Sequence, residues 1–125
     1  MSINQKDIDL QVDFYEISPD GKSFQFSNFI QRASFYHNRS KRQLVRPGKI
    51  YPYHFTNSFF TSKLIKKGSL IRVVVMPVNS REWEKNYGTG KEVSTETMAN
   101  ATAFNIRLFT GGKYNSSILM PCVIL

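Results

Sequence analysis

The pattern of hydrophobic and polar positions near the start of the chain has a period of two. The apolar members of this alternation are Ile8, Leu10, Val12 and Phe14. Because successive side chains of a strand point to opposite faces, this period is typical of a half-buried strand. We therefore expect a strand over residues 8 to 17.

A turn signal follows this first strand. In Ser18-Pro19-Asp20-Gly21 the proline presets φ at the second turn position, and the glycine permits a tight exit. The alternation then resumes with Phe24, Phe26 and Ile30. We expect the two alternating segments to pair as a hairpin.

The most continuous apolar run extends from Leu70 to Met76 and is interrupted only by Arg72. Its β-branched residues and its lack of alternation are typical of a central strand that is covered on both faces. We therefore expect the hydrophobic core to lie around this strand.

Further segments have weaker strand patterns. One alternates through Tyr51, Tyr53 and Phe55, and it is expected at a sheet edge or a bulge because Pro52 has no donor N–H. Residues 101 to 109 alternate around Phe104, Ile106 and Leu108, and residues 117 to 125 are expected to form a last strand. Residues 58 to 67 are ambiguous and have room for one helical turn.

Short strands, turn signals and hardly any helix predict an all-β, antiparallel sandwich or barrel. A chain of 125 residues is long enough for one core and too short for two, so residues 1–125 are interpreted as a single domain. Residues 77 to 98 have no convincing period, and a connection of that length is usually functional or part of an interface.

The composition of the chain excludes some kinds of site and partner. No run approaches the ~20 apolar residues of a membrane-spanning helix, so no membrane partner is expected. Cys122 is the only cysteine, which excludes an internal disulfide and a cysteine-based metal cluster, and we expect it to be a small buried hydrophobe. The formal net charge of +8 fits nucleic acid, an anionic surface or an acidic neighbouring domain, and charge alone does not choose among them.

The usual catalytic fingerprints are missing from the sequence. It has no G-x-S-x-G elbow, no P-loop and no complete G-x-G-x-x-G. The two histidines, His37 and His54, fall in a basic loop (residues 36 to 49) and on the expected edge strand. We therefore expect no catalytic residue and no cofactor in this chain.

Two binding chemistries remain as alternatives to a structural role. Asp7, Asp9 and Asp13 project from one face of the first strand and offer oxygen ligands for calcium, but without a glycine turn and further carboxylates we favour a solvated face and no metal site. The basic loop has aromatic neighbours that could stack on single-stranded nucleic acid, but aromatic residues are common in strands, and no nucleic-acid partner is expected.

Several segments share motifs with one family, in the same order along the chain. They are Asp7-Ile8-Asp9 with Pro19-Asp20-Gly21, Arg32-Ala33-Ser34, Pro47-Gly48, Gly68 with Arg72, Asn86-Tyr87-Gly88-Thr89-Gly90, and Ser117-Ile118-Leu119-Met120-Pro121. Together they resemble the C-terminal domain of the cocaine-esterase and X-Pro dipeptidyl-peptidase family of α/β-hydrolases. Of the family's Gly-His-Arg-x-Arg strand, this chain keeps the glycine and the last arginine.

The resemblance implies a galactose-binding-like jelly-roll β-sandwich packed against an α/β-hydrolase domain, its partner in the parent chain. That catalytic domain supplies the serine, aspartate and histidine, and none of these maps onto this sequence. The parent would hydrolyse an ester or amide, such as an acyl linkage or the bond after an X-Pro dipeptide. This chain would then be a non-catalytic C-terminal domain that supports the active site.

The resemblance also suggests where the partner domain lies. We expect the segment from 78 to 98 to contact it through Trp83, Tyr87 and the turn Gly88-Thr89-Gly90, with Asn86 fixing the loop by side-chain to backbone hydrogen bonds. In the family the jelly roll begins before the aspartate pair, so the first strands are expected to be missing here. We therefore also expect self-association through an exposed edge or face.

Two other functions remain open from the residues alone. A β-sandwich of this kind can be a carbohydrate-binding module, for which Trp83 and Tyr87 would be the exposed aromatic platforms. A basic single-stranded nucleic-acid binder is the third alternative.

Overall fold

A computed structural model describes residues 1–56 and 60–123 of the chain. Every strand pairing in it is antiparallel, and the helical elements are single 3-10 turns. The elements are β1 (Ser2–Ile3), β2 (Asp9–Ile17), β3 (Ser23–Arg32), η1 (Ala33–Phe35), β4 (Leu70–Pro77), η2 (Val93–Thr95), η3 (Met98–Asn100) and β5 (Ile106–Arg107). The expected all-β antiparallel class is confirmed. No helix in the described ranges is long and apolar enough to cross a bilayer.

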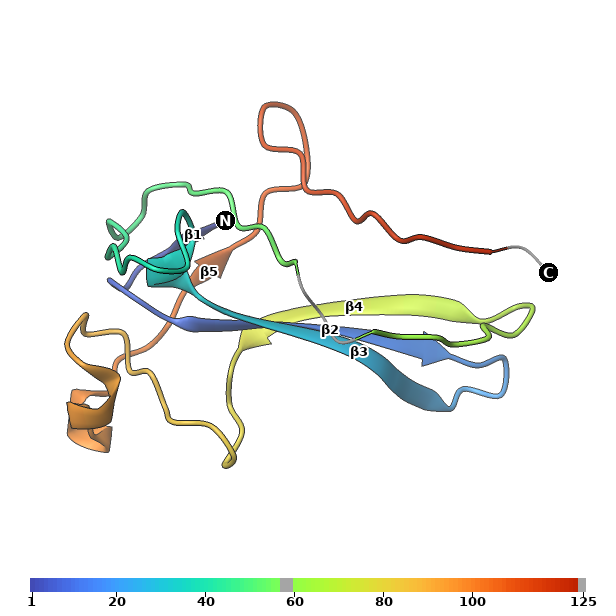
Figure 1. The fold of residues 1–125 in the computed structure, drawn as a ribbon, viewed down its shortest axis with the longest axis horizontal. Coiled ribbons are helices and arrows are strands. Elements are labelled where there is room, and N and C mark those ends of the chain that lie inside the picture. The colour runs from blue at the N-terminus through green and yellow to red at the C-terminus, as the bar shows by residue number, and fades with distance from the viewer. Residues whose placement is uncertain (57–59, 124–125) are drawn as a thin grey trace.

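The hairpin expected from the alternating pattern is confirmed as β2 and β3 (Figure 1). Its turn closes because the Gly21 N–H donates to the Ser18 carbonyl at 2.8 Å, and the Ser18 N–H donates to the Lys22 carbonyl at 2.9 Å. Gly21 has φ +83°, which a residue with a Cβ rarely adopts. A register shift between Phe14 and Tyr15 marks a β-bulge in the hairpin.

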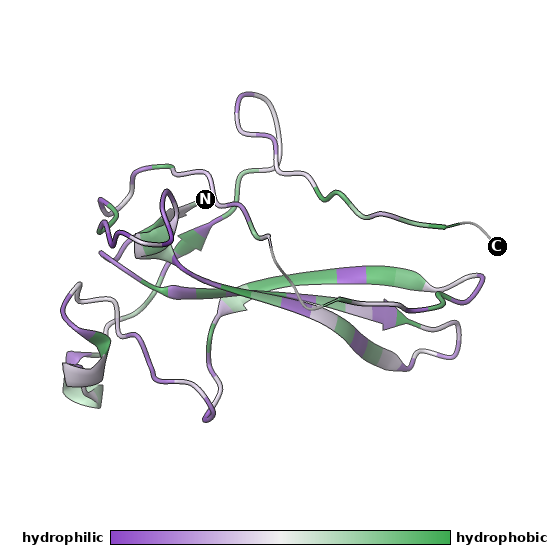
Figure 2. Cartoon of the chain, viewed as in Figure 1, coloured by the Kyte–Doolittle hydropathy of each residue, from purple (hydrophilic) through white to green (hydrophobic). Residues whose placement is uncertain are grey.

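The position of β4 corrects the expectation of a central strand. The sheet order is β3-β2-β4, so β4 has one strand neighbour among the described residues. Figure 2 shows β4 as almost continuously hydrophobic, yet Leu70 is 70% exposed and Ile71 44% exposed. An apolar run shows that a strand can be buried on both faces, but the rest of the chain decides whether anything covers it.

The core lies at one end of the sheet rather than around β4. It is formed by the N-terminal segment, the start of β2, η1 and the following loop, and its buried members are Ile3, Ile8, Leu10, Ala33, Val45 and Tyr51. The segment around Tyr51 is not the strand that its alternation suggests. Instead, the Tyr51 N–H donates to the Met1 carbonyl at 2.9 Å, and its ring packs into the core.

The C-terminal part forms less strand than expected. Of residues 101 to 109, only β5 pairs, with Ile106 opposite Ile3. Residues 117 to 123 contain no strand, and residues 124 and 125 of the expected last strand lie outside the described residues. Cys122 is exposed, so its expected burial is wrong. The ambiguous segment has no helical turn over 60 to 67, and its residues 58 and 59 are also outside the described part.

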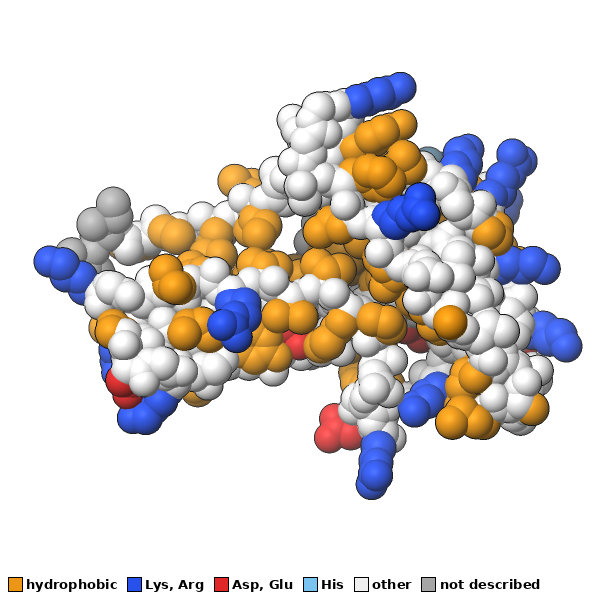
Figure 3. All heavy atoms as spheres, turned by 180° about the vertical axis from the view of Figure 1, so that it is seen from behind, with side chains coloured by type: hydrophobic (Ala, Val, Ile, Leu, Met, Phe, Trp, Pro, Cys, Tyr) orange, Lys and Arg blue, Asp and Glu red, His pale blue; other side chains and the backbone are white. Residues whose placement is uncertain are grey.

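The three-stranded sheet has two chemically different faces. On one, Val12 and Phe14 are buried, and the Phe14 ring lies 5.7 Å from that of Phe29 between centroids. The opposite face is here called the polar face. Residues paired across two strands share a face. The polar face therefore carries Asp9, Gln11, Asp13 and Tyr15 from β2 and their partners Arg32, Ile30, Asn28 and Gln25 from β3. Seen from behind, hydrophobic side chains gather along the elongated part of the molecule with a basic side chain among them, and many of the Lys and Arg side chains project around the bulkier end (Figure 3).

Candidate functional site

Asp7 is fully buried just before β2, and its carboxylate is completely engaged. One oxygen accepts hydrogen bonds from the backbone N–H groups of Ile8 and Ser34 at 3.0 and 2.9 Å. The other accepts from the Ser34 hydroxyl at 2.8 Å and from the Arg42 guanidinium at 3.2 Å. Since a buried charge is tolerated only when it is paired and hydrogen-bonded, Asp7 holds the N-terminal segment, η1 and the basic loop together.

Asp9 forms a second junction, at the start of β2. The Arg32 guanidinium donates two hydrogen bonds to its carboxylate, from Nε at 2.7 Å and from Nη2 at 3.0 Å. The Asn86 side-chain amide donates a third, at 3.2 Å. The bidentate contact with Asp9 raises the pKa of Arg32. Three segments separated in sequence therefore meet at this carboxylate.

Asp13 completes the series and corrects the expectation of a solvated strand face. It is 1% exposed, and its two oxygens accept from the Gln11 amide at 2.7 Å and the Tyr15 hydroxyl at 3.1 Å. Burial of the phenol, together with this hydrogen bond, raises the pKa of Tyr15. In residues 1–56 and 60–123, no group of three or more His, Cys, Asp or Glu side chains is arranged to hold a metal ion.

The turn from Asn86 to Gly90 is fixed from inside. The Asn86 side-chain oxygen accepts the Gly88 N–H at 2.9 Å, as expected for this loop. The Glu96 carboxylate accepts the Tyr87 N–H at 2.6 Å, the Thr89 N–H at 3.1 Å and the Thr89 hydroxyl. The loop is therefore closed by its own side chains.

The two glycines of this turn pack closely against other segments of this chain. A Cβ on Gly88 would lie 2.9 Å from the Asp7 carbonyl oxygen and 2.9 Å from Phe104, and one on Gly90 would lie 2.9 Å from Leu44. Of the residues proposed from sequence as an interface, Trp83 is the one that stands well out, at 55% exposure. Tyr87 and Thr89 are partly buried.

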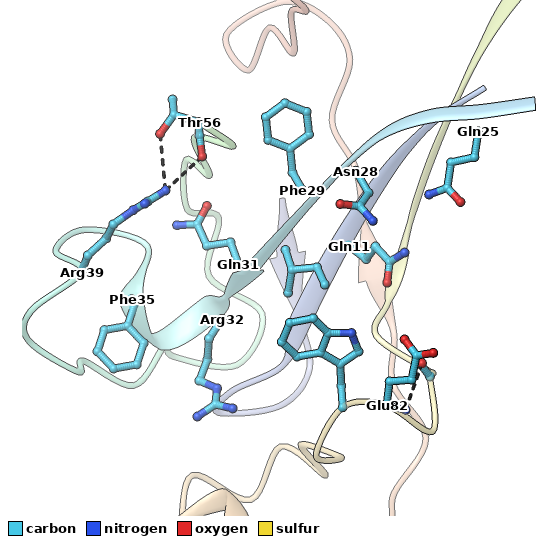
Figure 4. A pocket seen from close by; sticks show the side chains of 13 residues that line it. Gln11, Gln25, Asn28, Phe29, Gln31, Arg32, Phe35, Arg39, Thr56 and Glu82 are labelled. Carbon is cyan, nitrogen blue, oxygen red and sulfur yellow. Dashed lines mark hydrogen bonds between the residues drawn. The ribbon is translucent and has the colours of Figure 1, made fainter. Parts of the chain in front are cut away.

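A groove of about 590 Å³ lies beside Trp83 and along β3, and its lining takes side chains from both faces of that strand. Its walls come from β2, β3, the basic loop and the segment after β4, and Figure 4 shows them close up. The lining residues from the sheet include Gln11, Gln25, Asn28 and Ile30; those beyond it include Phe35, Arg39, Glu82 and Trp83. The groove is a half-open hollow in the surface rather than an enclosed cavity.

The two histidines do not contribute catalytic geometry. Both are exposed, and in the described part of the chain neither is hydrogen-bonded to a serine hydroxyl or a carboxylate. The Ser34 hydroxyl is buried and donates to the Asp7 carboxylate, which also accepts from Arg42, and among the described residues no histidine is hydrogen-bonded to this serine. A nucleophile needs an adjacent base to be activated.

The groove is the feature that sequence reasoning missed. Gln11, Asn28 and Gln25 are unremarkable polar positions in the alternating pattern, and their common face depends on the hairpin register. The bulge between Phe14 and Tyr15 shifts that register by one residue, so counting alone would place Gln25 on the wrong face.

Comparison with known proteins gives one partial likeness. No family model matches the chain. The chain is 25% identical to the cocaine esterase of Rhodococcus sp. over 124 residues, which is 98% of this chain and 21% of that protein. Nearly the whole chain is thus similar to about a fifth of an esterase.

Proposed function

We propose that this chain is the non-catalytic C-terminal β-sandwich domain of a larger serine hydrolase of the esterase, acylase or X-Pro dipeptidyl-peptidase type. The domain supports an active site that a separate α/β-hydrolase domain provides. The observation that carries the proposal is the similarity to a cocaine esterase along 98% of this chain but only 21% of the relative. A match of that shape is typical of one domain of a longer enzyme.

The aspartate junctions support this interpretation. The segments that carry the family resemblance are far apart in sequence, and three of them meet at Asp7 and Asp9. Ser34 and Arg32 come from the Arg32-Ala33-Ser34 segment, and Asn86 opens the segment Asn86-Tyr87-Gly88-Thr89-Gly90. Three of the shared motifs thus join parts of the domain to one another, which supports a structural rather than a catalytic role for them.

Trp83 and the loop that follows it form our proposed contact with the catalytic domain. Trp83 is exposed, and Tyr87 is partly buried beside the turn. Asn86, Gly88, Thr89 and Gly90 hold that turn rigidly against the domain, which lowers the entropy cost of binding. In this role the four residues position the interface, and the two aromatic side chains provide the contact area.

Two measurements test the proposal. The purified chain should not hydrolyse nitrophenyl esters or X-Pro amides, and the reading frame that encodes it should also encode a G-x-S-x-G motif upstream. In the full-length protein, backbone amides of residues 78 to 98 should exchange more slowly than in the isolated chain. Turnover that survives repurification and is lost on Ser34→Ala would overturn the non-catalytic assignment, and equal exchange rates would overturn the interface.

A further inference from the structure

We propose that the groove beside Trp83 binds a neutral oligosaccharide, which stacks on Trp83 and is held by the side-chain amides of Asn28 and Gln25. This ligand site goes beyond the proposed role in a hydrolase and does not rest on it; it competes with that role for Trp83, because one indole cannot stack on a sugar ring while it lies against a catalytic domain. The inference comes from the shape, aromatic content, hydrogen-bonding groups and charge of the groove.

The size and form of the groove suit a ligand that lies along the surface. Its volume of about 590 Å³ falls within the roughly 300–1,000 Å³ that small-molecule sites occupy. Because it is half open, both ends of a chain-like ligand can extend beyond it. A linear oligosaccharide fits such a channel better than a compact metabolite, which favours an enclosed pocket.

An apolar platform lies in this groove. Trp83 is 55% exposed and Ile30 is 37% exposed, and both line it. A large indole that remains half exposed beside a hollow is a ready surface for stacking, since aromatic side chains contribute large contact areas and still allow neighbouring polar groups to stay wet. The C–H face of a pyranose ring is the apolar surface that such a platform accepts.

The hydrogen-bonding groups of the groove are mainly planar amides. Figure 4 shows Gln11, Asn28 and Gln25 following one another along the hairpin. Within the described residues, the side-chain amides of Asn28 and Gln25 have no partner, whereas that of Gln11 is engaged by Asp13. Each free amide offers donors and an acceptor together, the combination that neighbouring sugar hydroxyls require.

Gln31 gives a second observation that points to a missing partner. Its side-chain oxygen is shielded from solvent and accepts no hydrogen bond from any described residue, yet Gln31 lines the groove. Buried polar atoms without a partner are rare in folded proteins and call for an explanation. A small rotation of this side chain toward a bound hydroxyl would satisfy the oxygen.

The charge balance favours a neutral ligand over a nucleic acid. Arg32 is neutralised by its bidentate contact with Asp9. Arg39 donates to the neutral Thr56 carbonyl at 3.0 Å and keeps its charge, so it is the one unpaired cation among the lining residues. Glu82 adds a negative charge to the same lining. Binding a polyanion depends on unpaired Lys and Arg that neutralise phosphates, and this groove offers little of that.

The groove also follows the outer edge of β3, whose one strand neighbour among the described residues is β2. Peptides commonly add to a free sheet edge through main-chain hydrogen bonds. An extended peptide is therefore the competing ligand, and a fluorescence response of Trp83 to such a peptide but to no neutral oligosaccharide would overturn the proposal.

The single tryptophan of the chain makes the test specific to this site. Fluorescence of Trp83 is followed while the chain is titrated with cellohexaose, xylohexaose, mannohexaose or maltohexaose, at up to about 10 mM so that weak binding also registers. We expect a saturable change with at least one of them and none with oligogalacturonate or an oligonucleotide. No change with any neutral hexasaccharide, or a response only to the anionic probes, would overturn the proposal.

Variants then test the assigned contacts, with calorimetry as the readout because Trp83→Ala removes the fluorophore. Trp83→Ala and Asn28→Ala should each weaken binding of the responding saccharide by about 10-fold or more. Asn115→Ala is the matched control, since this asparagine is exposed and lies outside the groove. Unchanged affinity in both groove variants would overturn the assignment. Esterase activity enters none of these readouts, so this test and that of the hydrolase role fail independently.

Discussion

At the scale of single residues, buried carboxylates link segments that the sequence keeps far apart. Asp7 has no solvent contact, yet four donors from three residues surround it. Removing one partner of such a group leaves the others unsatisfied, which costs far more than losing a surface contact. Asp20, by contrast, pairs with Lys22 in the open at 2.8 Å, where solvent weakens the pair.

Glu16 joins the end of β2 to the turn that precedes β4. Its carboxylate accepts the Lys66 N–H at 3.0 Å and the Ser69 hydroxyl at 2.8 Å, and Lys63 lies 3.3 Å away. The hydrogen bond from the Lys66 backbone, followed by that from Ser69, lowers the pKa of Glu16 below its ordinary value of 4.5. All three contacts favour the charged form.

Stability should therefore depend on pH through Glu16. A carboxyl whose pKa is lower in the folded state stabilises the fold fully above its unfolded-state pKa, and this contribution is lost as pH falls through the folded-state value. We expect Glu16→Gln to lower the urea midpoint at about pH 7 and the difference from wild type to shrink below about pH 4.5. Urea unfolding across this range measures the effect.

A matched glutamate serves as the control for this prediction. Glu82 is exposed and forms no ion pair in the described part of the chain, so Glu82→Gln should change the urea midpoint little at any pH. A difference between wild type and Glu16→Gln that stayed constant down to low pH would contradict the assigned role of the charged carboxylate.

At the scale of elements, the turn from Asn86 to Gly90 depends on how closely it approaches the N-terminal segment. Gly88 has φ +79°, and the Lys6 N–H donates to its carbonyl at 3.2 Å. A Cβ at this position would meet the Asp7 backbone at 2.9 Å. The side chain of Asp7 is buried and held by four hydrogen bonds, so this residue cannot shift cheaply to open the space.

Comparing two glycines separates backbone strain from this steric conflict. Gly21 also has a positive φ, +83°, but a Cβ there has nothing within 4 Å. We expect Gly21→Ala to cost about 1–2 kcal/mol from φ alone. Gly88→Ala should cost a further 1–3 kcal/mol or so, because overpacking adds to the same strain.

Chemical unfolding of the two glycine variants measures both free energies. If Gly88→Ala and Gly21→Ala destabilise the chain equally, the close approach of this turn to Asp7 does not contribute. A larger cost at Gly88, accompanied by faster amide exchange in residues 86 to 90, is the expected outcome.

At the scale of the whole molecule, the sheet is only partly covered. Among residues 1–56 and 60–123, no backbone hydrogen bond reaches the outer edge of β4. Leu70 and Ile71 at the start of this strand are exposed, and so is Phe24 near the hairpin turn. An unpaired edge beside apolar side chains is a template for association.

We expect the chain to self-associate through this edge, most simply as a twofold dimer. Sedimentation at several concentrations should show a mass that rises with concentration. The double variant Leu70→Lys, Ile71→Lys should shift the equilibrium toward monomer, because lysine on an edge strand opposes pairing.

Leu119→Lys is the control for the self-association experiment. Leu119 is 99% exposed in the C-terminal segment, which runs apart from the sheet in Figure 1, so this change should leave association intact. Loss of association in the control instead would place the contact on the C-terminal segment. A monomer mass at every concentration would contradict self-association altogether.

Local patterns by themselves determined the hairpin and the fold class. The alternation from Ile8 to Phe14 and the turn at Pro19-Asp20-Gly21 act over a few residues, and the structure confirms both. Periodicity predicts this strand correctly because one of its faces is buried. The turn is predicted correctly because its residues act through their own φ preferences.

Tertiary structure decided what lies beside each element. The apolar run of β4 predicts a central strand, but β4 lies at an edge of the sheet. The alternating segment at Tyr51 packs into the core without becoming a strand. Burial of Asp7 and Asp13 and the alignment of Gln11, Asn28 and Gln25 likewise depend on partners distant in sequence and on one bulge. Period and propensity describe what a segment can bury, whereas its actual neighbours follow from how the whole chain packs.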